Sequence, residues 1–291
     1  MSVYKHEYAA YSGPVTPLWA RIGVLTRYAW GEVWSSRITV GLFVVCLLPA
    51  LVFLVGIYLT NNPLARMILM HGNAPPFAID AGYFLKVLAN QSWFALVLTA
   101  WAAPGLVSFD LADNALPILL SHPISRFGYV LGKFLALFSF LSLVTWIPCL
   151  LLFACQACTS PRPWIADHLR IGFGLAAGSV LWITLLAVLG LALSAWVRWK
   201  VVATGLIFAA ILVPAGIGGI ISGVLRTQWG FLLNVPVVMT QLWERMLGAP
   251  PSMHGIEPLP TTAIVLVLFL AFFICIAMLN ARIRAREVVR G

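Results

Sequence analysis

The chain has 291 residues, of which 62% are hydrophobic and only 9% are charged. A soluble globular protein carries roughly 25% charged residues, so this composition, with a mean hydropathy of +0.97, excludes soluble, disordered, collagen-like, coiled-coil and disulfide-rich secreted classes. Eighteen lysines and arginines against nine acidic residues give a net charge of +9. In so apolar a chain this excess indicates anionic lipids and membrane topology rather than nucleic acid. Composition therefore predicts an all-α integral membrane protein.

Residues 1–37 are expected to form a cytoplasmic tail followed by an amphipathic helix. Residues 1–17 are polar and contain two prolines, so they do not look like a signal peptide. In 17–36, apolar residues recur at helical spacing, with polar residues on another side. The apolar positions are Leu18, Ile22, Leu25, Ala29 and Val33. This pattern predicts a helix on the inner membrane interface, or one packed on the protein's own cytoplasmic face.

Apolar runs predict six transmembrane helices within 38–280. About 20 apolar residues are needed to cross a hydrocarbon core of roughly 30 Å, and Lys133 is the only charged residue in the qualifying runs. They lie near 38–60, 92–109, 128–155, 171–197, 201–222 and 261–280. Pro214, followed by several glycines, predicts a break in the fifth span. The semi-apolar segment 223–248 is predicted to be an outer re-entrant structure before the last span.

The distribution of basic residues orients these spans. All but six of the 18 lysines and arginines fall on the inner side if the N-terminus is cytoplasmic, as the positive-inside rule requires. The six outer residues are Arg66, Lys86, Arg162, Arg170, Arg226 and Arg245. Both termini are therefore expected in the cytoplasm, with 281–291 as a basic tail. The expected location is the cytoplasmic (inner) membrane, as a multi-pass protein in contact with its lipids.

Between the second and third runs, residues 113–122 are predicted to form a short cytoplasmic helix. Asp113 or Asn114 can cap its start, Pro123 ends it, and Ser125 can cap the third span. The leucines on one face are Leu116, Leu119 and Leu120. A short helix with an apolar face, held between two membrane helices, suits docking into a groove on another protein.

The same stretch carries a run, LLSHPISR, followed by Gly132-Lys133. It resembles the segment after the second span in permeases of the type-2 ABC exporter family. That family pattern has an acidic residue, Gly-Thr, Leu-Leu-Ser, Pro, Ser-Arg and Gly-Lys. The matching positions are Asp110, Leu119-Leu120-Ser121, Pro123, Ser125-Arg126 and Gly132-Lys133. Asn114-Ala115 stands in place of Gly-Thr and Pro117 is an additional proline. The overall layout and the LLNVP run at 232–236 are also similar to that family.

The resemblance implies a permease subunit in a homo- or heterodimer, driven by cytoplasmic ABC ATPase subunits that hold ATP and Mg²⁺. Residues 113–122 would be the coupling helix. The residues implied in coupling are Asp110, Asp113, Leu116, Leu119, Leu120, Ser121, Pro123 and Arg126. The chain itself is expected to hold no cofactor or metal and not to be the enzyme, because Gly128–Lys133 lacks the spacing and hydroxyl of a phosphate-binding loop. An amphipathic or lipid-linked cargo fits the nearly uncharged spans.

Several residues allow other interpretations. Asp110 and Asp113 could be an acid/base pair, although their spacing beside a helix start fits capping and pairing with the helix dipole better. Arg126 could bind an acidic groove of a partner or a lipid phosphate. Cys155 and Cys158 fit apolar thiols best, and a structural disulfide or redox or metal chemistry are the alternatives.

Two other classes of function compete with the exporter. The chain could be a membrane anchor or assembly subunit of a larger complex that reuses the permease fold, because function depends on sites rather than folds. A neighbouring ATPase gene would favour the exporter over this anchor. An intramembrane enzyme would need polar groups converging in a pocket, and the sequence has no H-E-x-x-H or G-x-S-x-G motif.

Overall fold

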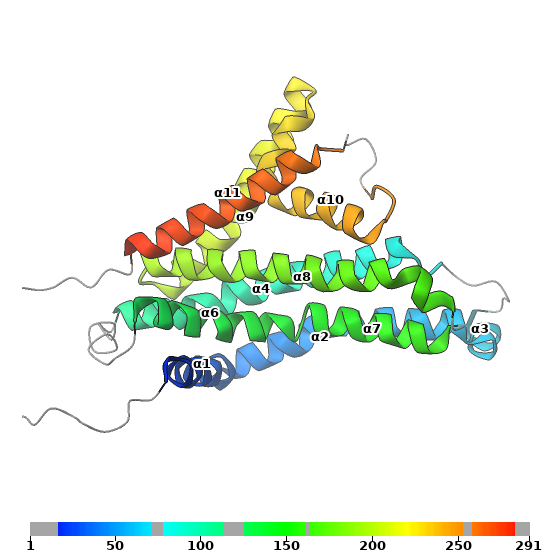
Figure 1. Cartoon of the computed structure of the whole chain (residues 1–291), viewed down its shortest axis with the longest axis horizontal. Coiled ribbons are helices and arrows are strands. Elements are labelled where there is room, and N and C mark those ends of the chain that lie inside the picture. Colours follow the sequence, from blue (N-terminus) through cyan, green and yellow to red (C-terminus); the bar gives the residue numbers. More distant parts are fainter. Residues whose placement is uncertain (1–16, 71–77, 113–124, 161–162, 253–257, 283–291) are drawn as a thin grey trace, which may run out of the picture.

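The computed structural model describes residues 17–70, 78–112, 125–160, 163–252 and 258–282. Within these ranges the chain is helical apart from short connections, and no strand occurs (Figure 1). The first half contains α1 (Leu18–Ser35), α2 (Arg37–Asn61), α3 (Pro63–Met70), α4 (Ala81–Ala112), α6 (Arg126–Ser142) and α7 (Trp146–Thr159). The second half contains α8 (Pro163–Trp196), α9 (Lys200–Leu225), the 3₁₀ turn η1 (Gln228–Leu233), α10 (Val235–Leu247) and α11 (Thr261–Arg282).

Five helical stretches of the described chain are long and apolar enough to cross a membrane. They are Arg37–Asn61, Arg126–Thr159, Trp164–Trp196, Lys200–Leu225 and Thr261–Arg282. The helix α4, which contains the predicted run 92–109, is not among them, and its first half carries Lys86, Asn90 and Gln91. These stretches make the chain an all-α, multi-pass membrane protein.

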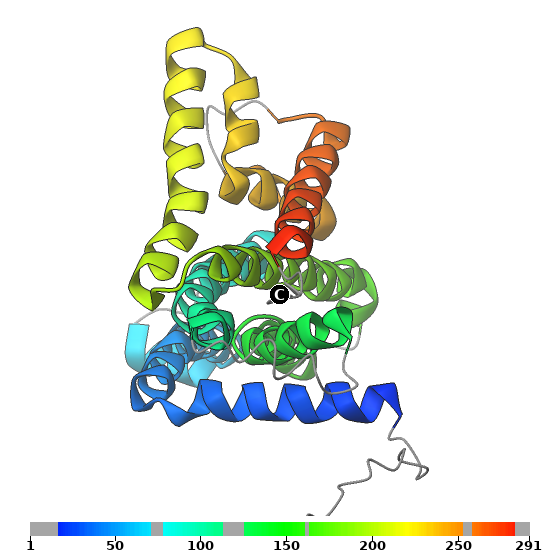
Figure 2. The same cartoon turned by 90° about the vertical axis from the view of Figure 1, so that its left-hand side faces the viewer.

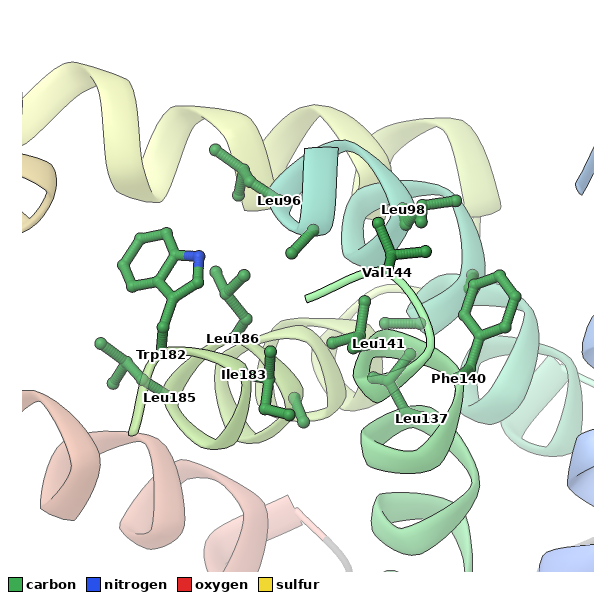
Figure 3. Packing of buried hydrophobic residues seen from close by; sticks show 14 of the residues in the cluster. Leu96, Leu98, Leu137, Phe140, Leu141, Val144, Trp182, Ile183, Leu185 and Leu186 are labelled. Atoms are coloured by element: carbon green, nitrogen blue, oxygen red, sulfur yellow. The ribbon is translucent and has the colours of Figure 1, made fainter. Parts of the chain in front are cut away.

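The core lies where α4, α6 and α8 run side by side. Figure 3 shows Leu96 and Leu98 of α4, Leu137 and Leu141 of α6, and Ile183 and Leu186 of α8 packed together, all fully buried. Gly190 allows α8 to approach α4, because a Cβ there would lie 2.8 Å from the Cβ of Ala103. Trp182 of α8 also donates a 3.0 Å hydrogen bond from Nε1 to the carbonyl oxygen of Ser92 on α4.

The amphipathic helix predicted over 17–36 is present as α1, which lies across one end of the bundle (Figures 1 and 2). Ile22, Ala29 and Val33 of its apolar face are buried, whereas Leu18 is exposed. The helix packs on α6 at Gly132, where a Cβ would lie only 2.9 Å from the Cβ of Leu25. The apolar stripe therefore packs against the protein itself. We refer to this as the α1 end of the bundle.

The predicted third span, 128–155, is two helices. The segment from Leu143 to Thr145 interrupts it, and α7 starts at Trp146. Pro148 in the first turn of α7 explains the interruption, since a proline has no N–H to donate to residue 144 and its ring clashes with that carbonyl. The predicted break at Pro214 is wrong: α9 continues through this proline to Leu225. A proline removes a single helical hydrogen bond, and the helix here tolerates the loss.

The segment 223–248, predicted to be re-entrant, folds back on α9. After Arg226, which has a left-handed backbone (φ 48°), η1 packs against α9 and α10 packs against α8. The turn η1 can approach α9 this closely because residue 230 is a glycine. A Cβ at that position would lie 2.5 Å from Ser222 Oγ and 2.6 Å from Gly218 O. In Figure 2, α9, α10 and α11 form a second layer that leans away from the bundle.

Candidate functional site

A charged network lies at the α1 end of the bundle, around Lys133 of α6. The Lys133 Nζ atom is 3.0 Å from Asp110 Oδ2 on α4 and 3.4 Å from Glu32 Oε2 on α1. The lysine side chain is 9% exposed, that of Asp110 is 19% exposed and that of Glu32 is 40% exposed. One ammonium group therefore connects three helices that are far apart in sequence.

Tyr129 completes the network. It lies one helical turn before Lys133 on the same face of α6, and its hydroxyl donates a 2.7 Å hydrogen bond to Asp110 Oδ2. The phenol is fully buried. The Asp110 carboxylate is thus held by two groups from α6, which offsets the cost of placing a negative charge in the last turn of α4, where the helix dipole is unfavourable to it.

Local sequence explains why these groups meet. Asp110 lies in the last turn of α4, and α6 starts directly after Ser125, whose Oγ accepts a 3.0 Å hydrogen bond from Gly128 N. The predicted cap of the third span is thereby confirmed. In sequence, residues 113–124 connect α4 to α6, so the network joins the two helices that flank the segment expected to bind a partner.

The implied coupling residues fall into two groups. Asp110 belongs to the network, and Arg126 is exposed at the start of α6. The others lie outside the described residues: Asp113, Leu116, Leu119, Leu120, Ser121 and Pro123. The capping role expected for Asp110 differs from what the structure shows, since this carboxylate pairs with Lys133 and Tyr129 from α6.

Sequence reasoning missed Glu32, Tyr129 and Lys133 as site residues. A signal was present for Lys133, because a single charge within an apolar span needs a partner. The sequence could not name Glu32 as one of the partners, since it is 101 positions away from Lys133. Only the packing of α1 across α6 brings the two together.

A groove of about 1060 Å³ opens beside the network. Its lining includes Leu25 and Tyr28 of α1 together with Asp110 and Lys133 of the network. The site thus combines a charged contact between helices with an accessible groove. In the described part of the chain, no three His, Cys, Asp or Glu residues cluster as metal ligands would.

A second set of contacts connects α4 to its neighbours nearer the middle of the bundle. Trp101 donates a 3.1 Å hydrogen bond from Nε1 to Thr39 Oγ1 on α2. Thr204 Oγ1 on α9 donates a 2.8 Å hydrogen bond to Ala100 O, and Lys200 Nζ lies 4.7 Å from the centre of the Trp101 ring. A displacement of α4 would therefore also displace α2 and α9.

The thiols of Cys155 and Cys158 are both free and exposed near the end of α7. They do not form the disulfide considered among the interpretations of the sequence.

Comparisons with known proteins give no family assignment: no family model matches the sequence, and no curated protein matches it.

Proposed function

We propose that this chain is the membrane-spanning permease subunit of an ATP-driven exporter related to the type-2 ABC family. It would pair with a second permease subunit and be driven by separate cytoplasmic ATPase subunits. The run between Asp110 and Lys133 that resembles that family supports the proposal. The observation that carries it is the position of Lys133, which joins α1, α4 and α6 where 113–124 connects α4 to α6.

In this proposal α4 is a sixth membrane crossing, and both termini are cytoplasmic. Two features of the fold support it. The helix α4 runs along the bundle in close contact with α8, and the described chain begins with α1 and ends with α11 at the same end of the bundle (Figure 1). The basic residues expected on the inner side include Arg21 and Arg27 of α1 and Arg282 at the end of α11.

The contacts of α4 suggest how ATP-driven closure of the partner would act. Closure pushes on 113–122, and the Lys133 network makes α4, α6 and α1 respond together. The hydrogen bonds of Trp101 and Thr204 then carry the movement of α4 to α2 and α9. The spans that tilt are thus the first, second and fifth, and the pathway lies between two permease subunits. An amphipathic or lipid-linked cargo suits their apolar faces.

The direct test is isolation of the tagged chain from its own membrane in mild detergent, followed by mass spectrometry of the proteins bound to it. We expect a stoichiometric ATPase subunit that is lost in Leu119→Asp and retained in Leu119→Met, because only the former places a charge on the apolar face. Other membrane subunits without an ATPase would overturn the proposal and favour an anchor or assembly subunit.

A second experiment separates coupling from binding. Reconstituted with its ATPase, Glu32→Gln should retain the partner but lose transport, because it removes the ion pair that connects Lys133 to α1 and leaves the pair with Asp110 in place. Retention of full transport by Glu32→Gln would contradict the assigned role of the network.

A further inference from the structure

An apolar groove lies between α8, α10 and α11, away from the charged network. It has a volume of about 280 Å³. Side chains from all three helices line it, among them Thr184, Leu185, Met239, Leu242, Val265 and Phe269. We call it the α11 groove.

The shape of the α11 groove restricts what can occupy it. Its lining on α11 runs from Val265 to Phe272, a length of about 10 Å at 1.5 Å per residue. Over that length, all but one of the side chains that line the groove are hydrophobic. The groove therefore suits a narrow apolar occupant such as one acyl chain.

A positive charge lies at one end of this groove. Arg245 is three residues after the lining residue Leu242, and Thr261 is one turn before the lining residue Val265. The guanidinium of Arg245 donates to Thr261 Oγ1 at 2.6 Å and to the carbonyl oxygen of Leu259. These two bonds place the charge where α10 ends and α11 begins.

The charge of Arg245 is not neutralised by a described carboxylate. Asp110 and Glu32 pair with Lys133, and the adjacent Glu244 uses Oε1 to accept hydrogen bonds from Ser252 N and Oγ. A guanidinium has five N–H donors, of which the two bonds above use two. A second cation is near, since Arg170 donates to the carbonyl oxygens of Arg245 and Met246.

We propose that the α11 groove is a binding site for an anionic phospholipid. One acyl chain lies between α8, α10 and α11, and the phosphate is bound by Arg245. The apolar walls match the chain, and the guanidinium at the mouth matches the phosphate in charge and in the planar geometry of its donors. The lipid site does not depend on ATPase coupling. Failure of the proposed function would therefore leave this proposal intact, and the reverse also holds.

The test uses the full chain in detergent with phosphatidylglycerol that carries a photoactivatable diazirine in the acyl chain, and the same label in phosphatidylcholine. After illumination, cross-linked peptides are identified by mass spectrometry. We expect cross-links on the peptides that contain Leu242 and Phe269, severalfold stronger for phosphatidylglycerol. Equal labelling by the two lipids in the unmodified protein would mean ordinary surrounding lipid and would overturn the proposal.

Two pairs of variants make the assignment specific. Thr184→Trp fills the groove and should abolish these cross-links, whereas Ile274→Trp, at an exposed position on α11 outside the lining, should not. Unchanged labelling in Thr184→Trp would overturn the proposal.

Arg245→Gln should remove the preference for phosphatidylglycerol, and Arg245→Lys should keep it. A thermal unfolding scan of each variant identifies any that fail to fold, and for those the comparison of the two lipids in the unmodified protein decides.

Competition separates a lipid from a free anion. An excess of inorganic phosphate should leave the cross-links unchanged, because the acyl chain supplies much of the binding. Displacement by inorganic phosphate alone would show a simple anion site and contradict the lipid assignment.

Discussion

Lys133 and Asp110 form an ion pair of 3.0 Å across the two helices between which residues 113–124 run. The pair is largely shielded from water, and Tyr129 adds a hydrogen bond to the same carboxylate oxygen. The two helices that flank the connecting segment in sequence are thereby held together.

The first prediction concerns this pair. Lys133→Met leaves the Asp110 carboxylate without its cation and should destabilise the protein by about 3–5 kcal/mol. The double variant Lys133→Met with Asp110→Asn should recover much of that loss. Glu32→Gln, at a more exposed carboxylate, should cost no more than about 1 kcal/mol. Denaturation in mixed micelles measures all three. A larger loss in the double variant than in Lys133→Met would contradict the pairing.

The second prediction tests the contact between α1 and α6. Gly132→Ala introduces a Cβ that clashes with Leu25 and should destabilise the protein by about 1–3 kcal/mol. Gly23→Ala is the control on α1, because a Cβ there meets nothing within 4 Å. It should be neutral or stabilising by up to about 1 kcal/mol, as expected from helix propensity. Equal unfolding midpoints for the two variants would exclude the close packing of α1 on α6.

The third prediction compares two adjacent glycines of α9. A Cβ on Gly218 would overlap the carbonyl oxygen of Gly230 in η1, whereas one on Gly219 would meet nothing within 4 Å. Gly218→Ala should therefore weaken the packing of η1 on α9 and expose 226–234 to protease. Gly219→Ala should leave the digestion pattern unchanged. Limited proteolysis with mass spectrometry distinguishes the variants, and identical patterns would rule out the contact.

The fourth prediction concerns the hydrogen bond from Trp101 to Thr39. In a double-mutant cycle with Trp101→Phe and Thr39→Val, the two substitutions remove the same interaction. The coupling energy should be about 0.6 kcal/mol, the average for such bonds between membrane helices. Strictly additive effects on the free energy of unfolding would show that the bond does not contribute.

The local features of the fold were largely predictable from sequence. The helical spacing of apolar residues located α1 because Ile22, Ala29 and Val33 repeat on one face, and the long apolar runs located the five stretches that can cross a membrane. These signals depend on neighbouring residues alone, so no knowledge of the folded chain was needed.

The features of the fold and of the site that were not predicted depend on contacts between segments that are distant in sequence. Sequence placed a break at Pro214 and none near Pro148, yet the structure has the reverse, because the effect of a proline depends on how the surrounding helices accommodate it. The candidate site was only partly predicted for a similar reason. Asp110 was selected by its motif, whereas Glu32 and Tyr129 join it through the packing of α1 and α6.

The interruption at Leu143–Thr145 has a mechanical consequence. A continuous helix transmits torque along its whole length through its ladder of hydrogen bonds, whereas this ladder is broken between α6 and α7. Twisting of α6 at Lys133 can therefore relax at the joint before it reaches α7. The helices α4 and α8 are not divided in this way, so they can carry a displacement along their whole length.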